Sequence, residues 1–128
     1  MLRGLDIEGL STGLSGITGG TVQVENCTID RFLTAGINFV PAVANSKLQV
    51  VDTIVRNNGT AGSSGGVLVR PSGAGNAILT NVSLDNNNFG LRSDGSGGTT
   101  NLNVTVKGGS ASDNTNGSIV AVTGGLTL

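Results

Sequence analysis

One segment recurs four times in this chain, and the recurrence limits the fold more than any other feature. The copies read VQVENCTIDRF from residue 22, LQVVDTIVRN from 48, AILTNVSLDN from 77 and VTVKGGSASD from 104. Successive copies are offset by 26, 29 and 27 residues. Each begins with alternating apolar and polar residues, the signature of a strand that buries one face. Because no helical periodicity intervenes, the repeat predicts a coil of short strands that stacks on its neighbours.

Alignment of the four copies places similar side chains in columns. One apolar column predicts a core ladder made of Val24, Val50, Leu79 and Val106. Two residues later stand residue types that tolerate a left-handed backbone, which predicts a sharp bend between two strands. This turn ladder consists of Asn26, Asp52 and Asn81, with Gly108 last. The earlier segment LDIEGL at 5–10 matches the start of the pattern, so Leu5 and Ile7 are expected in the first two apolar columns.

A third strand follows a glycine in each coil, in GINFV, GVLVR, GLRSD and GSIVAV. We therefore expect one all-β domain over residues 1–128, with a partial first coil at 1–20. Further coils are expected at about 21–46, 47–75, 76–100 and 101–128. The alternative is an antiparallel sandwich of short strands. A sandwich needs hairpin turns between neighbouring strands and no column-by-column repetition, so the repeat favours the solenoid.

The strings LRGLDIEGLSTGLSGI, VENCTIDRFLTAGINF and GVLVRPSGAG extend this repeat over essentially the whole chain. They resemble the bacterial right-handed parallel β-helix repeat proteins, which share the architecture of the pectate lyase superfamily. The resemblance implies a single-stranded β-solenoid of about four to five coils, each with three short strands. It also implies a secreted or cell-surface protein that begins with a signal peptide and capping coils. No signal peptide is visible at MLRGLDIEGL, so we expect an N-terminally truncated piece.

Composition excludes several functional classes. A net charge of −1 and a pI near 5.0 provide no basic surface for nucleic acid. No apolar run approaches the roughly 20 residues of a membrane span. The chain contains no His, which argues against a Ser-His-Asp triad and a histidine-based metal site. Its single cysteine, Cys27, cannot form an internal disulfide, and its apolar column predicts a buried side chain.

The resemblance would place a Ca²⁺ site and an Arg base on the outer face of the third strands. The sequence puts Arg70, Arg92 and Asp94 there. One carboxylate is far short of the six to eight oxygen ligands that Ca²⁺ takes. We interpret Arg70 and Asp94 as a surface ion pair, and we predict no catalytic residue, no metal site and no cofactor.

Two further groups of side chains are interpreted structurally. Asp30 and Asp85 share a column, but Arg56 stands between them, so a solvated ladder of alternating charge is favoured over a glycosidase carboxylate pair. Aromatic residues that could bind carbohydrate are few and are expected to pack in the core. They are Phe32, Phe39 and Phe89.

The ends of the predicted solenoid are the remaining candidate surface. Neither MLRGLDIEGL nor VAVTGGLTL offers a charged cap or an amphipathic helix, so open strand edges are expected. The favoured function is a non-enzymatic structural or surface-interaction solenoid that forms homo-oligomers end to end. The alternative is a polysaccharide-binding or degenerate carbohydrate-active β-helix. A third possibility is that the chain is a fragment without an independent role.

Overall fold

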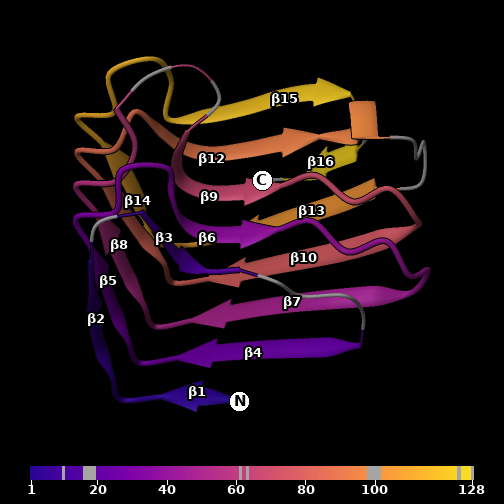
Figure 1. Ribbon diagram of the computed structural model, residues 1–128, viewed down its shortest axis with the longest axis horizontal. Helices are drawn as coiled ribbons and strands as arrows, with labels where there is room; N and C mark the ends of the chain where they lie inside the picture. The colour runs from indigo at the N-terminus through magenta and orange to yellow at the C-terminus, as the bar shows by residue number, and fades with distance from the viewer. Residues whose placement is uncertain are drawn as a thin grey trace.

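The computed structural model describes residues 1–9, 11–15, 20–60, 62, 64–97, 102–123 and 125–127. The chain winds as a β-solenoid whose strands lie beside their counterparts in the next coil and form three sheets (Figure 1). Sheet A contains, in spatial order, β1 (Leu2–Arg3), β4 (Thr21–Glu25), β7 (Ser46–Val51), β10 (Gly75–Thr80), β13 (Leu102–Lys107) and β16 (Gly125–Thr127).

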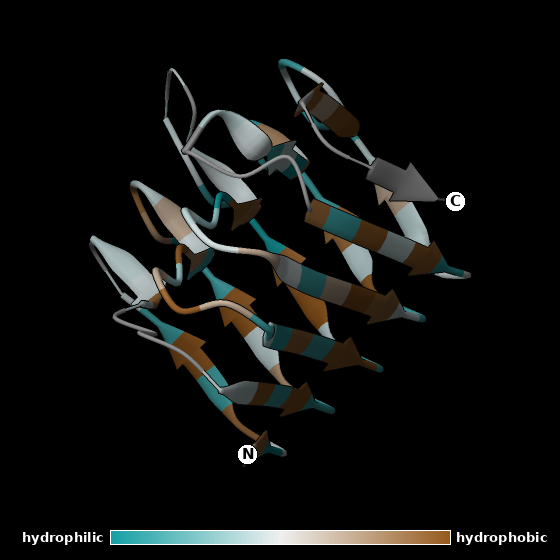
Figure 2. Ribbon diagram, turned by 90° about the vertical axis from the view of Figure 1, so that its right-hand side faces the viewer, coloured by the Kyte–Doolittle hydropathy of each residue, from teal (hydrophilic) through white to brown (hydrophobic). Residues whose placement is uncertain are grey.

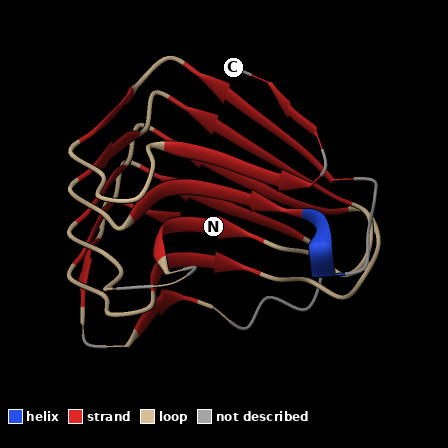
Figure 3. Ribbon diagram, turned by 90° about the horizontal axis from the view of Figure 1, so that it is seen from above, coloured by secondary structure: helices blue, strands red, loops and turns tan. Residues whose placement is uncertain are grey.

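The second and third strands of each coil form the other two sheets. Sheet B contains β2 (Asp6–Glu8), β5 (Thr28–Asp30), β8 (Ile54–Arg56), β11 (Ser83–Asp85) and β14 (Ser110–Ser112). Sheet C contains β3 (Thr12–Leu14), β6 (Ala35–Phe39), β9 (Gly65–Val69), β12 (Phe89–Asp94) and β15 (Ile119–Thr123). Seen from above, loops join the strands at the corners, and the short 3₁₀ turn η1 (Gly95–Gly97) follows β12 (Figure 3).

All pairings between the described strands are parallel. The predicted all-β solenoid with three short strands per coil is therefore confirmed, and the antiparallel sandwich is excluded. Parallel pairing is possible because each strand returns to its own sheet only after a complete coil, which supplies the long crossover that parallel neighbours need.

The register of sheet A places the predicted core ladder in one line. Val24, Val50 and Leu79 are 0% exposed and pair in succession, and Val106 continues the line but is half-buried. Outward residues alternate with them, so brown and teal bands alternate along these strands in Figure 2. Burial of an aliphatic side chain stabilises the fold by about 1.5–3 kcal/mol, so these ladders supply much of the driving force for stacking.

The expected register of the first coil is wrong. Leu2, and not Ile7, pairs with Val24 in sheet A, while Ile7 pairs with Ile29 in sheet B. Gly4 has a φ of 66° and forms the bend that Asn26 forms in the next coil. Alternation in LDIEGL fits either strand of a coil, and the preceding glycine turn decides between them.

Candidate functional site

The predicted turn ladder lies at the bend from sheet A to sheet B. The backbone there is left-handed, with φ of 53° at Asn26, 47° at Asp52, 53° at Asn81 and 62° at Gly108. All four residues are exposed, and Asn81 Nδ2 donates a hydrogen bond of 2.7 Å to Asp52 Oδ1. Short polar side chains tolerate this backbone because they can bond neighbouring polar groups.

A second turn column, between sheets B and C, was missed by sequence analysis. Positive φ values recur at Arg31, Asn57, Asn86 and Asp113, each directly after a sheet B strand. Asn86 Nδ2 donates to Asn57 Oδ1 at 2.7 Å, so these polar side chains also connect adjacent coils. Arg31 obscures the column in the sequence, because Arg is not a typical left-handed residue.

An asparagine ladder, defined as Asn58, Asn87 and Asn114, runs inside that bend. Asn58 and Asn87 are 0% and 1% exposed, and Asn114 is half-buried. Each Oδ1 accepts from a backbone N–H one coil earlier: Phe32 N to Asn58, Asn58 N to Asn87 and Asn87 N to Asn114, at 2.9–3.0 Å. Such a ladder satisfies buried backbone donors that no strand neighbour can reach.

The amide nitrogens of the asparagine ladder are also bonded. Asn87 Nδ2 donates to the carbonyl of Val55 at 2.9 Å, and Asn114 Nδ2 donates to that of Leu84 at 2.8 Å. The signal for this ladder is present in the sequence, because the three asparagines are offset by 29 and 27 residues like the other columns. In the sequence alone, the segments RNNG and DNNN resemble ordinary polar loops.

A polar hollow of about 640 Å³ follows the turn ladder along the outside of the coils. Ile54 lies within it and is 40% exposed. The other lining residues carry carboxamide, carboxylate or hydroxyl groups or are glycine: Asn26, Asp52, Thr53, Asn81, Ser83, Gly109 and Ser110. Groups of this kind can hydrogen-bond sugar hydroxyls, but none of these lining residues is aromatic.

The charged column of sheet B differs from the predicted solvated ladder. Asp30 is only 5% exposed and accepts from Arg56 Nε at 3.2 Å and from Asn57 Nδ2 at 2.8 Å. Asp85 is half-buried, and hydrogen bonds from Ser83 and then Ser112 lower the pKa of its carboxyl. Burial of Asp30 is tolerated because both of its oxygens have donors.

The predicted outer-face cluster of Arg70, Arg92 and Asp94 is brought together, but its carboxylate is not a surface group. The Asp94 side chain is 7% exposed, with Arg92 Nη2 at 3.5 Å and Arg70 Nε at 3.9 Å. Burial alone raises the pKa of Asp94, yet the hydrogen bonds from Ser96 and the two arginine charges outweigh it and lower the pKa. The pairing of β12 with β15 shifts register between Ser93 and Asp94, so that Asp94 pairs with Thr123.

The aromatic side chains and the cysteine follow the sequence expectation with one exception. Phe32, Phe39 and Cys27 are buried, as predicted. Phe89 is half-buried, and its ring centroid lies 5.2 Å from the Arg92 guanidinium carbon. Phe89 therefore adds a cation–π contact to Arg92 of this cluster.

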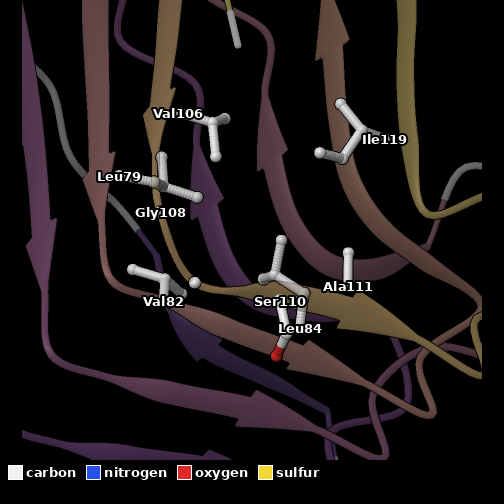
Figure 4. Close-up of a pocket in the computed structure, with 9 residues that line it drawn as sticks. Leu79, Val82, Leu84, Val106, Gly108, Ser110, Ala111 and Ile119 are labelled. Carbon is white, nitrogen blue, oxygen red and sulfur yellow. The ribbon is translucent and has the colours of Figure 1, made fainter.

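An apolar hollow of about 120 Å³ opens in the last coil (Figure 4). In the inward columns, Gly109 takes the position that Val82 holds one coil earlier, and Ala111 takes that of Leu84. The last coil therefore lacks the side chains that fill earlier coils. Other apolar residues line it: Leu79, Val82, Leu84, Val106 and Ile119. Val106, Ala111 and Ile119 are only half-buried, so the core is incompletely covered there.

Two features are absent from the part of the chain that the structure describes, namely a metal-binding cluster and a membrane-spanning helix. Those residues contain no group of three or more His, Cys, Asp or Glu side chains that could hold a metal ion. They also contain no helix long and apolar enough to cross a membrane. No protein-family model, curated protein or solved structure gives a match to this chain. The fold therefore defines a β-solenoid protein.

Proposed function

We propose that this protein is a non-enzymatic structural solenoid that associates with itself through its end coils. The observation that carries the proposal is the apolar hollow in the last coil. A filled core stabilises each inner coil, whereas Val106, Ala111 and Ile119 contact the core but remain half-exposed. Covering them with another molecule would remove apolar surface from water, at about 25 cal/mol per Å².

The first coil offers a second apolar surface. Leu5 is 44% exposed, and Ile7 and Leu14 are half-buried although they pack against the core. Among the described strands, β2 and β3 are the edge strands of sheets B and C here, and β14 and β15 are the edge strands at the other end. Edge strands present unpaired backbone groups that readily accept a further strand.

Low charge removes an obstacle to self-association. Only 12% of residues are charged and the net charge is −1, so copies of the chain repel one another weakly. The inner coils also show that stacking is favourable, because every inner strand already pairs on both sides.

Sedimentation velocity over a wide range of protein concentration tests the proposal. We expect the weight-average mass to rise with concentration and to fall again on dilution. The matched variants are Ala111→Arg, which places a charge at an inward position of the last coil, and Ser112→Arg, which places it outward. Only the first should suppress association, and a monodisperse monomer at all concentrations would overturn the proposal.

The absence of catalysis is tested separately. Polygalacturonate with Ca²⁺ is the appropriate substrate, because the sequence resembles pectate lyase-like β-helix proteins. We expect no unsaturated product. Product that disappears in Arg92→Ala would assign this arginine a catalytic role and contradict the non-enzymatic proposal.

Polysaccharide binding is a second candidate function, and the polar hollow along the turn ladder favours it. The hollow spans several coils and presents Asp52 and Asn81 to solvent. A glycan array with the unmodified protein, Asp52→Asn and the distant control Lys47→Gln tests this candidate. Binding that is weakened in the first variant and kept in the second supports it, and an array without signal excludes it for the glycans present.

A further inference from the structure

Asn-Gly pairs occur twice in the sequence, at Asn58–Gly59 and at Asn116–Gly117. An Asn that precedes Gly readily loses its side-chain amide in water, because Gly has no side chain to shield its backbone nitrogen. Asn58 lies in an inner coil as part of the buried asparagine ladder, whereas Asn116 is exposed. The same chemical group is therefore held in two different surroundings within one chain.

Deamidation of Asn58 would proceed by ring closure and hydrolysis. Gly59 N bonds to Asn58 Cγ, the Cγ–Nδ2 bond breaks, and the proton of the Gly59 N–H leaves with the ammonia. Water then opens the cyclic imide at either of its carbonyls and yields aspartate or isoaspartate. In sum, a carboxamide and a water become a carboxylic acid and ammonia, so the reaction needs no enzyme, cofactor or oxidant.

The folded coil holds each group that this reaction would change. Gly59 N donates to the Phe32 carbonyl at 2.8 Å, and the N–H of the same Phe32 donates to Asn58 Oδ1 at 3.0 Å. The leaving nitrogen, Asn58 Nδ2, donates to Ile29 O at 3.3 Å and to Asn87 Oδ1 at 3.0 Å. Asn58 is also 0% exposed, so solvent water does not reach the reacting atoms. The coil must open before the pair can react.

The products do not fit the site that the carboxamide leaves. A carboxylate has no N–H, so it would face the Ile29 carbonyl and Asn87 Oδ1 as a third acceptor, and even the neutral acid has a single donor. An unpaired charge at this buried position would cost far more than a lost hydrogen bond. Isoaspartate lengthens the backbone beside Gly59, where an added Cβ would already lie 2.6 Å from Gly65 N.

We propose that Asn58–Gly59 is a latent deamidation site, which the fold keeps closed and which opening of this coil activates. Each opening exposes the pair to water, and a chain that reacts in the open state cannot return to the native coil. Repeated unfolding is thereby converted into a permanent loss of foldable protein. Both residues lie in an inner coil, so the site is independent of the proposed self-association.

Peptide mapping by mass spectrometry tests whether the fold closes the site. The protein is incubated in mildly alkaline buffer with and without guanidinium chloride, and aspartate and isoaspartate formed from Asn58 and Asn116 are quantified over time. In denaturant the two asparagines should react at similar rates. Without denaturant Asn58 should react at least about a hundredfold more slowly, because its rate scales with the small population of the opened coil.

Asn116 provides the comparison within the same samples, and the fold should slow it less than it slows Asn58. Equal rates of Asn58 with and without denaturant would overturn the proposal. An Asn58 that stays unreactive in denaturant while Asn116 reacts would also overturn it.

Refolding tests whether the products are rejected. Protein aged in denaturant is diluted into buffer, treated with protease to remove unfolded chains, and mapped again. The folded fraction should shrink with ageing time and contain unmodified Asn58. The variant Asn116→Gln removes the other pair and should lose refoldable protein at the same rate. Modified chains that survive protease as often as unmodified chains would contradict the proposal.

A substitution reproduces the product without ageing. Asn58→Asp should lower the urea midpoint far more than Asn103→Asp, which makes the same change at an exposed position of β13. Failure of Asn58→Asp to fold would agree with the proposal, and the ageing experiment on the unmodified chain tests it independently. Equal midpoints of the two variants would overturn it.

Discussion

The fourth coil (β10–β12) and the last coil (β13–β15) follow the same path, but only the fourth is filled. Leu84 is 1% exposed in the fourth coil, and its neighbour in the last coil is the half-buried Ala111. In the same way, the neighbour of Val82 in the last coil is Gly109. Turns and strand pairing therefore determine the path of the chain, while side-chain volume determines how well each coil is covered. A coil can therefore keep the fold and still leave a surface for a partner.

The largest expected effect comes from emptying the fourth coil. Leu84→Ala removes a buried side chain and leaves a cavity, so the free energy of unfolding should fall by about 2–5 kcal/mol. Ala111→Gly in the last coil should cost less than about 1 kcal/mol, because little surrounds that side chain. Urea denaturation with linear extrapolation compares the two. Similar losses would mean that the coils are equally well packed.

The asparagine ladder also differs between the fourth coil and the last coil. Asn87→Ala removes the acceptor of the buried Asn58 N–H and a donor to the Val55 carbonyl, and the free energy of unfolding should fall by about 2–3 kcal/mol. Asn114→Ala at the half-buried end of the ladder should cost about 1 kcal/mol, since water can replace part of its bonding. The order of the two losses in chemical denaturation is the critical result, and a larger loss for Asn114→Ala would contradict this view of the ladder.

Filling the last coil should have a smaller and opposite effect. Ala111→Val restores the side chain that Val55 contributes to the same column, and it should raise the free energy of unfolding by about 1 kcal/mol. Thermal unfolding measured at a low protein concentration isolates this effect from self-association. A destabilised variant would show that the hollow is already occupied.

The acid sensitivity of the folded protein should also arise in the fourth coil, which holds Asp85 and Asp94. The pKa of Asp94 is lowered in the folded protein, so this carboxylate contributes stability above its unfolded pKa of about 3.9 that is lost as the pH falls through the folded pKa. Asp94→Asn should therefore flatten the decline in unfolding free energy as the pH falls below about 4. Ser112→Ala removes one donor to Asp85 and should raise the pKa of that carboxyl. Unchanged pH profiles in both variants would contradict these assignments.

The sequence predicts the repeat, the three strands of a coil and the columns of sheet A because alternation and turn residues are local signals. Three other features could not be predicted from the sequence and are known only from the structure. LDIEGL alternates in a way that fits two strands, so only the Gly4 turn gives its register. Burial of Asp30 depends on donors from Arg56 and Asn57 one coil away. Asp94 is buried beside Arg92 of its own coil and Arg70 of the preceding coil.

The candidate site was predictable only in outline. Open ends were expected from the lack of charged caps, but the hollow required knowing that Gly109 and Ala111 are inward residues of the last coil. The asparagine ladder was missed because adjacent asparagines resemble an ordinary loop. Their recurrence at the offset of the apolar columns is the signal that distinguishes them.

Hydrogen exchange at two protein concentrations tests whether another copy of the chain completes the end coils. At high concentration, the amides of β2 (Asp6–Glu8) and β14 (Ser110–Ser112) should gain protection, while those of β8 (Ile54–Arg56) on an inner coil should not change. Equal exchange of β2 and β14 at both concentrations, under conditions in which the mass rises, would contradict the claim and place the association elsewhere on the molecule.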